Sequence, residues 1–193
     1  LKNVYMYDCV FEGTDQAFRF KTRRPRGGFV ENIYVERVRA NVKRQALYCD
    51  MLGSARWVGE LAQRYPAREI TPLTPWFANI SIHDVEITGC STLVDVSALP
   101  EKPVKNFFFG NVKAHCDRIG KICDATKFSM KDVRIESCDT VMRIDNCDYA
   151  SFFGFSNVTT GSSVKIEKTG GECRYLNVQT YPLVPVNYQS IRP

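Results

Sequence analysis

The sequence predicts an all-β chain that folds as a parallel β-helix, a solenoid of about six coils. Apolar residues recur six times with the spacing apolar-x-apolar-x-x-apolar-x-apolar, and a short alternating apolar pair follows 14 residues after the start of four of these units. Alternation with a period of two is typical of β-strands, and repeated units of this length bury their apolar faces by stacking on one another. The unit starts lie as little as 21 residues apart, which suits one coil with short turns.

Each unit is expected to contain two stretches of strand. The two-residue break inside the longer apolar pattern is interpreted as a bend between strands. The shorter pair of the fourth unit is displaced by about one residue, to Ile119 and Ile122, and the sixth unit is shorter than the others. The expected stretches are residues 4–11 and 18–20, 33–40 and 47–49, 80–87 and 94–96, 107–114 and 119–122, 128–135 and 142–144, and finally Phe153, Phe155 and Val158 followed by 164–166.

One long insertion interrupts the repeat, because the second and third units start 47 residues apart. The insertion covers residues 52–76. Its part at 54–63 is expected to form a short helix, although Gly59 is unfavourable inside a helix. Pro66, Pro72 and Pro75 predict irregular structure after that helix. No interdomain linker is recognisable, so residues 1–193 are expected to form a single β-helix segment that is a fragment of a longer one.

Two other repeat or all-β folds fit the pattern less well. An immunoglobulin-like sandwich would not keep a fixed 14-residue offset between matching apolar pairs, and the leucine spacing of a leucine-rich repeat is absent. Stacking in register also explains why Asn precedes the first apolar residue in four units. Asn32, Asn79 and Asn106 are therefore expected to form a hydrogen-bonded ladder of side chains at a bend.

The eight cysteines are interpreted as buried, free thiols. None of them forms a CxxC pair and no pair of histidines lies nearby, so no metal site is predicted. Cys90, Cys116 and Cys138 occupy similar positions in their units and are expected to stack as a column, about 5 Å apart. The even number of cysteines leaves disulfides open.

The charge balance permits an acidic partner. The chain has 26 Lys and Arg residues against 21 Asp and Glu residues, a net charge of +5. This mild excess suits a polyanionic sugar and gives no indication of a nucleic-acid partner. No apolar run approaches the length of about 18 residues that a transmembrane helix needs, so no membrane partner is expected.

The segment from Gly13 to Gly28 is richer in charged residues than packing requires. Phe18 and Phe20 are expected to face inward. Arg19 and Lys21 would then project outward from the same strand, about 7 Å apart. Two cations on one face suit a carboxylate or a phosphate, although a solvated strand face remains the simpler interpretation.

The order of motifs around this segment resembles the later half of glycoside hydrolase family 28, the polygalacturonases and their relatives. That family has a Gly-hydrophobic-Arg-Ile-Lys strand, a Gly-Arg-Gly-Gly turn, a Val-x-Asn-Ile strand and a Thr-Pro-x-Phe-x-Asn-Ile entry to the next coil. The matching segments cover about residues 1–115 together with the repeat, and Ala17, Phe20 and Pro25 depart from the family pattern. The matches are Ala17–Lys21, Pro25–Gly28, Val30–Ile33 and Thr74–Ile80.

The resemblance implies a right-handed parallel β-helix and, for the intact protein, inverting hydrolysis of pectic or other uronic-acid-containing polysaccharide. Arg19 and Lys21 would bind the substrate carboxylate beside the cleaved bond. The family's catalytic motifs, Asn-x-Asp, Asp-Asp and Gly-His-Gly, are absent from this sequence, and His83 and His115 are not flanked by Gly. No catalytic residue is therefore assigned in this chain, which is expected to be the C-terminal part of such an enzyme, inactive without further N-terminal coils.

Two aromatic residues complete the predicted substrate site. Tyr48 should point outward between two inward residues, and Trp57 lies in the long insertion, where aromatic rings can stack on sugars or pack the loop. No cofactor is expected. The expected partner is an acidic polysaccharide or oligosaccharide, and the resemblance implies a secreted, periplasmic or cell-surface protein.

Two rival functions remain. One is a non-catalytic β-helix module that binds glycans or serves on a surface. The other is a polysaccharide lyase on the same fold, which frequently needs calcium, but no run of Asp and Glu residues supports a calcium site.

Overall fold

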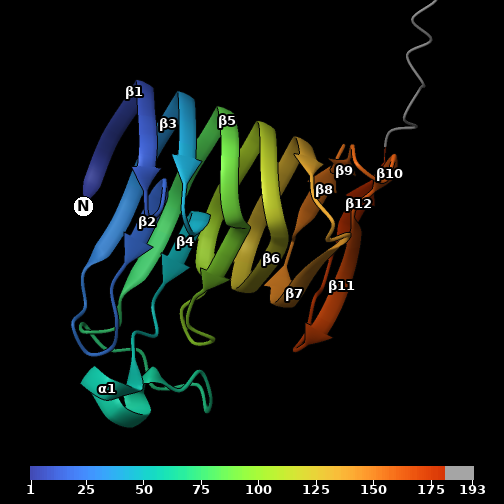
Figure 1. Cartoon of the computed structure of the whole chain (residues 1–193). Coiled ribbons are helices and arrows are strands. Elements are labelled where there is room, and N and C mark those ends of the chain that lie inside the picture. Colours follow the sequence, from blue (N-terminus) through green and yellow to red (C-terminus); the bar gives the residue numbers. More distant parts are fainter. Residues whose placement is uncertain (181–193) are drawn as a thin grey trace, which may run out of the picture.

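The computed structural model describes residues 1–180, which form an all-β structure as predicted (Figure 1). Its 12 strands belong to one sheet, and its longest strands pair in parallel in the order β1-β3-β5-β6-β7-β11. The elements are β1 (Lys2–Thr14), β2 (Phe18–Lys21), β3 (Phe29–Val42), β4 (Gln45–Asp50), α1 (Ala55–Val58), η1 (Gly59–Ala62), β5 (Trp76–Ser97), β6 (Val104–Glu136), β7 (Val141–Asp148), β8 (Ser151–Phe153), β9 (Ser156–Asn157), β10 (Ser162–Ser163), β11 (Lys165–Gly170) and β12 (Asn177–Gln179).

The first four repeat units pair in the predicted alignment. Val4 lies opposite Ile33, Ile33 opposite Ile80, and Ile80 opposite Phe107. The shorter apolar pairs align in the same way, because Phe18 lies opposite Leu47 and Leu47 opposite Val94. Equivalent apolar positions of successive units therefore form columns that fill one continuous core.

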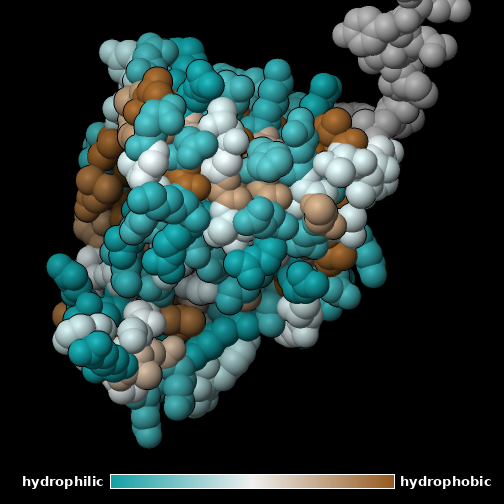
Figure 2. Space-filling view, viewed as in Figure 1, coloured by the Kyte–Doolittle hydropathy of each residue, from teal (hydrophilic) through white to brown (hydrophobic). Residues whose placement is uncertain are grey.

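The inward row of β1 forms the least covered end of this core. Val4, Met6, Cys9 and Phe11 are only partly buried, whereas the equivalent residues of the next unit are buried. Figure 2 shows hydrophobic atoms gathered at the edge of the molecule that β1 forms.

The predicted bends form where a residue adopts a left-handed backbone conformation. Asn3, Asn32, Asn79 and Asn106 have φ between 53° and 57°, a region that Asn tolerates better than most residues. The predicted ladder is confirmed and includes a fourth member. Each side-chain amide nitrogen donates to the side-chain oxygen of the preceding Asn, with distances of 2.9, 3.1 and 2.8 Å along the series.

Replacing Asn79 by Ala is expected to lower the free energy of unfolding by about 2 kcal/mol, because two amide hydrogen bonds are lost and Ala is strained at positive φ. Asn79→Gly, which removes the same hydrogen bonds without that strain, should lose less. Urea unfolding of the three proteins measures the difference. Equal stability of all three would contradict this role of the ladder.

The sixth unit is three residues earlier than predicted. Met130 lies opposite Phe152 and Arg134 opposite Ser156, so Phe152 and Phe155 occupy the inward positions while Val158 is exposed. The apolar pattern is broken there by Asn157, which is fully buried. Its side-chain nitrogen donates to the carbonyl oxygens of Ser137 and Asp139, both at 2.9 Å, and this polar substitution hid the correct alignment.

A glycine explains the one-residue displacement in the fourth unit. Gly120 lies opposite Val94 and Met142, at an inward position. Its φ is +103°, and a Cβ at this position would lie 1.9 Å from the carbonyl oxygen of Val94. The close backbone approach leaves no space for a side chain, and the neighbouring Ile119 is fully buried instead.

The thiol column is only partly confirmed. Cys90 and Cys116 lie opposite each other on β5 and β6 and are buried. Cys138 was wrongly placed in the column, because it is exposed and the buried residue beside it is Ser137. All eight cysteines are free: four are buried, Cys138 is exposed and the others are partly buried.

The helix predicted in the insertion forms as α1 followed by η1. The Ser54 hydroxyl accepts a hydrogen bond from the backbone N–H of Arg56 at 3.3 Å and caps α1. Gly59, with φ of 55°, ends α1.

Candidate functional site

Two rows of outward side chains cross the units on the face that carries β2. Phe18 and Phe20 are buried and Arg19 and Lys21 exposed, as predicted. Because the strands pair in register, each outward residue lies about 4.8 Å from its equivalent in the next unit. The Arg19 row is Arg19, Tyr48, Asp95, Lys121, Arg143 and Glu167, and the Lys21 row is Lys21, Asp50, Ser97, Cys123, Asp145 and Gly170.

The structure brings Arg19, Lys21 and Tyr48 together. Lys21 Nζ lies 3.5 Å from Asp50 Oδ2, and the Tyr48 hydroxyl donates to the same oxygen at 3.3 Å. Asp50 Oδ1 accepts hydrogen bonds from the backbone N–H groups of Leu52 and Gly53, at 3.0 and 2.9 Å. Asp50 is therefore a fully bonded carboxylate that fixes Lys21 and Tyr48 and begins the turn into the insertion.

Arg19 is the available cation of this group. Within residues 1–180 it makes no ion pair and no side-chain hydrogen bond, while its register neighbour Tyr48 is half-buried. Burial, followed by the charge of Asp50, raises the pKa of Tyr48 to about 12, so its hydroxyl keeps its proton at neutral pH. A cavity of about 390 Å³ lies beside Arg19 and Lys21 and is bounded further by Arg26 and Phe29.

Trp57 lies apart from these three residues. It is 71% exposed on α1, and the guanidinium of Arg56 lies over its ring at 5.2 Å from the centroid. In the part of the chain that the structure describes, no hydrogen bond joins Trp57 to Arg19, Lys21 or Tyr48. The structure therefore gives no support to grouping Trp57 with the other three predicted residues.

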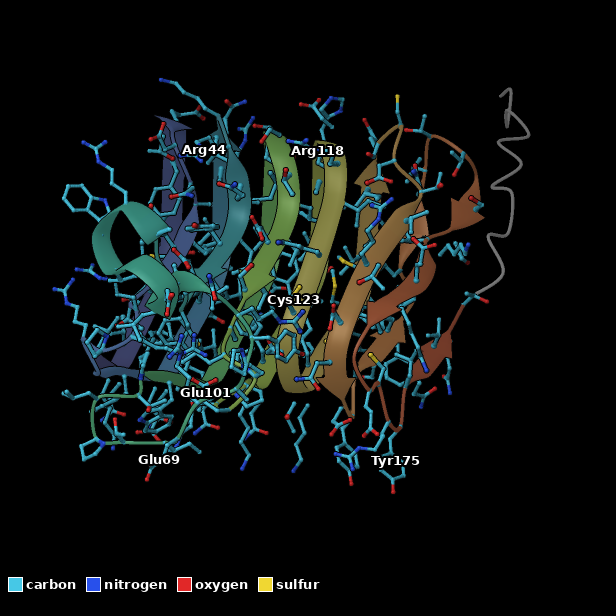
Figure 3. The ribbon with its side chains drawn as sticks, turned by 90° about the horizontal axis from the view of Figure 1, so that it is seen from below. Arg44, Glu69, Glu101, Arg118, Cys123 and Tyr175 are labelled. Atoms are coloured by element: carbon cyan, nitrogen blue, oxygen red, sulfur yellow. The ribbon has the colours of Figure 1, made fainter. Side chains whose placement is uncertain are left out.

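Two arginines, Arg24 and Arg64, link the insertion to other parts of the chain. Arg24 forms a bidentate pair with Glu101, which is labelled in Figure 3, with both distances 2.6 Å. Arg24 also donates to the carbonyl oxygens of Leu61 and Gln63. Arg64 donates to both oxygens of the buried Asp124 at 2.6 and 2.9 Å and to Asp145. These contacts tie the insertion to units on both sides of its own position.

Asp95 is the partly buried carboxylate of the Arg19 row, and the sequence did not predict it as a site residue. Its Oδ1 atom is buried and has no hydrogen-bond partner within the described chain. Burial raises the pKa of Asp95 above its usual value, and the nearby Lys121 only partly opposes this rise. Lys121 and Arg143 were missed as well. Asp95, Lys121 and Arg143 all lie in register with Tyr48, which was predicted to point outward. The same alternation argument would therefore have identified these three residues.

The raised pKa of Asp95 predicts a pH dependence. Burial disfavours the charged form, so the contribution of Asp95 to stability is greatest below the ordinary Asp pKa of 3.8 and is lost as the pH rises through the higher pKa of the folded state. Asp95→Asn is therefore expected to gain stability relative to the parent chain as the pH is raised from 3.5 to about 7. Urea unfolding at several pH values measures this gain. A constant difference between the two proteins would contradict it.

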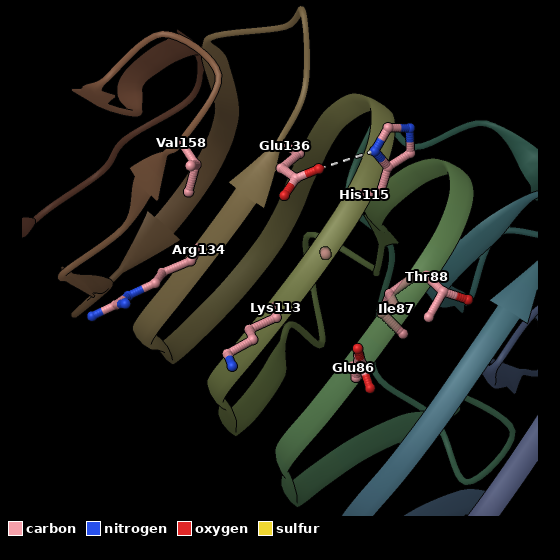
Figure 4. Close-up of a pocket in the computed structure, with 9 residues that line it drawn as sticks. Glu86, Ile87, Thr88, Lys113, His115, Arg134, Glu136 and Val158 are labelled. Carbon is pink, nitrogen blue, oxygen red and sulfur yellow. Dashed lines mark ion pairs between the residues drawn. The ribbon is translucent and has the colours of Figure 1, made fainter. Parts of the chain in front are cut away.

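A second hollow lies on a different face and combines opposite charges (Figure 4). Its volume is about 470 Å³, and Lys113, Arg134, Glu86 and Glu136 line it. His115 Nδ1 lies 3.5 Å from Glu136 Oε2, but both side chains are well exposed. Exposed ion pairs of this kind are common on protein surfaces and define no chemistry.

One cluster has the composition of a metal site although the sequence predicts none. Ligand atoms of Glu36, His83 and Asp84 lie within 4.8 Å of one another. Arg37 already bonds to Glu36, and the side-chain nitrogen of Asn111 donates to Asp84 at 2.5 Å. Hydrogen bonds, first those from Tyr5 and Arg37 to Glu36 and that from Asn111 to Asp84, lower the pKa values of both carboxyls. The cluster is thus accounted for by ion pairs and hydrogen bonds within the chain.

Comparison with known proteins leaves the geometry as the basis for a functional assignment. No helix among residues 1–180 has the length and apolar character needed to cross a membrane. No protein-family model, no curated protein and no solved structure matches the chain.

Proposed function

We propose that this chain is a segment of a right-handed parallel β-helix that binds acidic polysaccharide, and that it forms the C-terminal part of a polygalacturonase-like glycoside hydrolase. The observation that carries the proposal is the placement of Arg19 and Lys21 on one outward strand face, beside a cavity and next to Tyr48. Parallel pairing of matching residues in successive units supports the β-helix.

In this proposal the three polar residues have separate roles. Arg19, which has no partner among residues 1–180, would bind a substrate carboxylate through two parallel hydrogen bonds. Lys21, held by Asp50, would add a second cation at a fixed position. Tyr48 would keep its hydroxyl proton and offer an apolar ring edge to the sugar.

The acid and base of an inverting hydrolase would come from outside this chain. Such enzymes need two carboxyl groups roughly 6.5–9.5 Å apart, one to protonate the leaving oxygen and one to activate water. Among residues 1–180, β1 and β2 each pair on one side only, so further coils of the same protein would stack on them and supply that pair. A polysaccharide substrate would in turn place the protein outside the cytoplasm, secreted, periplasmic or at the cell surface.

The test is product analysis with the intact protein on polygalacturonate. Hydrolysis with inversion at the anomeric carbon, detected by NMR, supports the proposal. Unsaturated products that absorb in the ultraviolet would instead show a lyase. The second candidate is a non-catalytic glycan-binding module, which the absence of the family's catalytic motifs from the sequence favours. Binding of galacturonate oligomers without any cleavage by the intact protein would establish that candidate.

A further inference from the structure

A groove of about 320 Å³ lies further along the Arg19 row, away from Arg19 itself. Its walls carry three cations, Arg118, Lys121 and Arg143, together with Asp95. These side chains come from three successive units, because Lys121 lies opposite Asp95 on one side and opposite Arg143 on the other. We call this hollow the cationic groove.

The cations of the cationic groove are incompletely neutralised. Arg118 and Lys121 make no ion pair with any residue that the structure describes. Arg143 Nε lies 3.7 Å from Glu167 Oε2, but both side chains are about half exposed, and exposed ion pairs contribute little to stability. Lys121 and Arg143 are also direct neighbours across adjacent strands, an arrangement of like charges that is destabilising without an anion between them.

The nearby acidic side chains do not fill that role. Asp139, which also lines the cationic groove, accepts hydrogen bonds from the backbone N–H groups of Ile119 and Val141 at 3.0 and 3.2 Å. Asp95 is not within ion-pair distance of Lys121, and its buried Oδ1 lacks a donor. Asp95 also lines the cationic groove, so its carboxylate offers an acceptor to a hydroxyl bound there.

We propose that the cationic groove binds a second acidic sugar of the same oligosaccharide, with Lys121 and Arg143 on its carboxylate and the Asp95 carboxylate accepting a hydrogen bond from one of its hydroxyls. This inference rests on the proposed function, because it assumes that Arg19 and Lys21 bind the first carboxylate. Arg19 and Lys121 are three units apart in the row, about 14 Å at the usual strand spacing. The oligosaccharide would therefore run across the units.

The charge pattern favours a sugar acid over a simple polyanion. A phosphate or sulfate polymer presents acceptors only, and the Asp95 carboxylate would repel it. A uronic acid presents a carboxylate for the cations and hydroxyl donors for Asp95. One ligand thus satisfies both the excess cations and the carboxylate acceptor of the cationic groove.

The test compares galacturonate disaccharide with galacturonate decasaccharide, titrated calorimetrically into the 193-residue chain. The disaccharide is too short to reach both sites, so the decasaccharide should bind more tightly. Lys121→Met with Arg143→Met should reduce this gain in affinity by about tenfold or more, as expected for loss of charge-assisted hydrogen bonds. Lys113→Met with Arg134→Met, which removes the same two residue types from the opposite-charge hollow of Figure 4, is the matched control.

Asp95→Ala separates hydrogen bonding from charge. Removing a negative charge should strengthen anion binding if only electrostatics matter, whereas loss of the hydroxyl acceptor should weaken decasaccharide binding. Weaker binding by a folded Asp95→Ala chain supports the inference, and tighter or unchanged binding overturns the role of Asp95. Competition by polyphosphate as effective as that by decasaccharide would overturn the assignment to a sugar acid.

Failure of this inference is distinguishable from failure of the proposed function. If Arg19→Ala and Lys21→Ala weaken binding of both oligosaccharides while the Lys121 and Arg143 pair behaves like the control pair, the cationic groove plays no part and the proposed function stands. If every variant behaves like the control pair, both proposals are wrong.

Discussion

Replacing Glu101 by Ala is expected to lower the free energy of unfolding by about 3 to 5 kcal/mol, because it leaves Arg24 as a buried charge without its partner. The Arg24 and Glu101 side chains are each only 5% exposed, and the pair is bidentate. Burial is the largest influence and would raise the pKa of Glu101, but hydrogen bonds from Arg24 and from backbone N–H groups, together with the charge of Arg24, lower the pKa overall. The carboxylate is therefore ionised at neutral pH.

The same pair should control the insertion. Arg24 also donates to the carbonyl oxygens of Leu61 and Gln63, so its displacement would release the segment that follows α1. Urea unfolding measures the global loss of stability, and hydrogen exchange measures faster opening at residues 55–64. Arg56→Ala, which removes an exposed arginine from the same insertion, is the control. A Glu101→Ala chain as stable as that control would show that the buried pair is dispensable.

Arg19→Ala is expected to weaken binding of galacturonate oligomers by about tenfold to a hundredfold, because a bidentate contact with a carboxylate is lost. Lys21→Ala should weaken binding less, because the charge of Lys21 is already partly neutralised by its ion pair with Asp50. In the intact protein both changes should lower kcat/KM on polygalacturonate. Calorimetry at low and high salt should also show a smaller salt dependence in each variant.

Lys113→Ala supplies the control, because it removes one positive charge from a different face. If Arg19→Ala and Lys21→Ala both bind and turn over substrate as well as that control, neither residue contacts the carboxylate. Thermal unfolding of each variant excludes a loss of fold, which is not expected for outward side chains on β2.

The sequence predicted the strand alignment correctly where apolar spacing alone decides it. Units beginning at Val4, Ile33, Ile80 and Phe107 pair as expected, since each contributes the same inward columns. Prediction failed where a polar residue or a glycine occupies an inward position. Asn157 is such a case, because its burial depends on carbonyl acceptors in the preceding unit that no local pattern reveals.

The residues of the candidate site likewise fall into those that strand alternation predicts and those that it does not. Arg19, Lys21 and Tyr48 follow from strand alternation, and an extension of that reasoning would have reached Asp95, Lys121 and Arg143. The anchoring of the insertion could not be predicted. Arg64 reaches Asp124 and Asp145 over 60 and 81 residues of sequence, and contacts of that kind depend on the path of an irregular loop.

The asparagine ladder has a direction. Asn32 donates to Asn3 and Asn106 donates to Asn79, so every amide dipole points the same way and neighbouring bonds polarise one another. At the β1 end the ladder presents an amide donor, the side-chain nitrogen of Asn3, and a strand added there would need an acceptor at the matching bend. A strand shifted by one residue would lose that acceptor and turn its apolar side chains to solvent. The ladder thus helps to set the register of an added strand, because only one alignment keeps the hydrogen bond from Asn3.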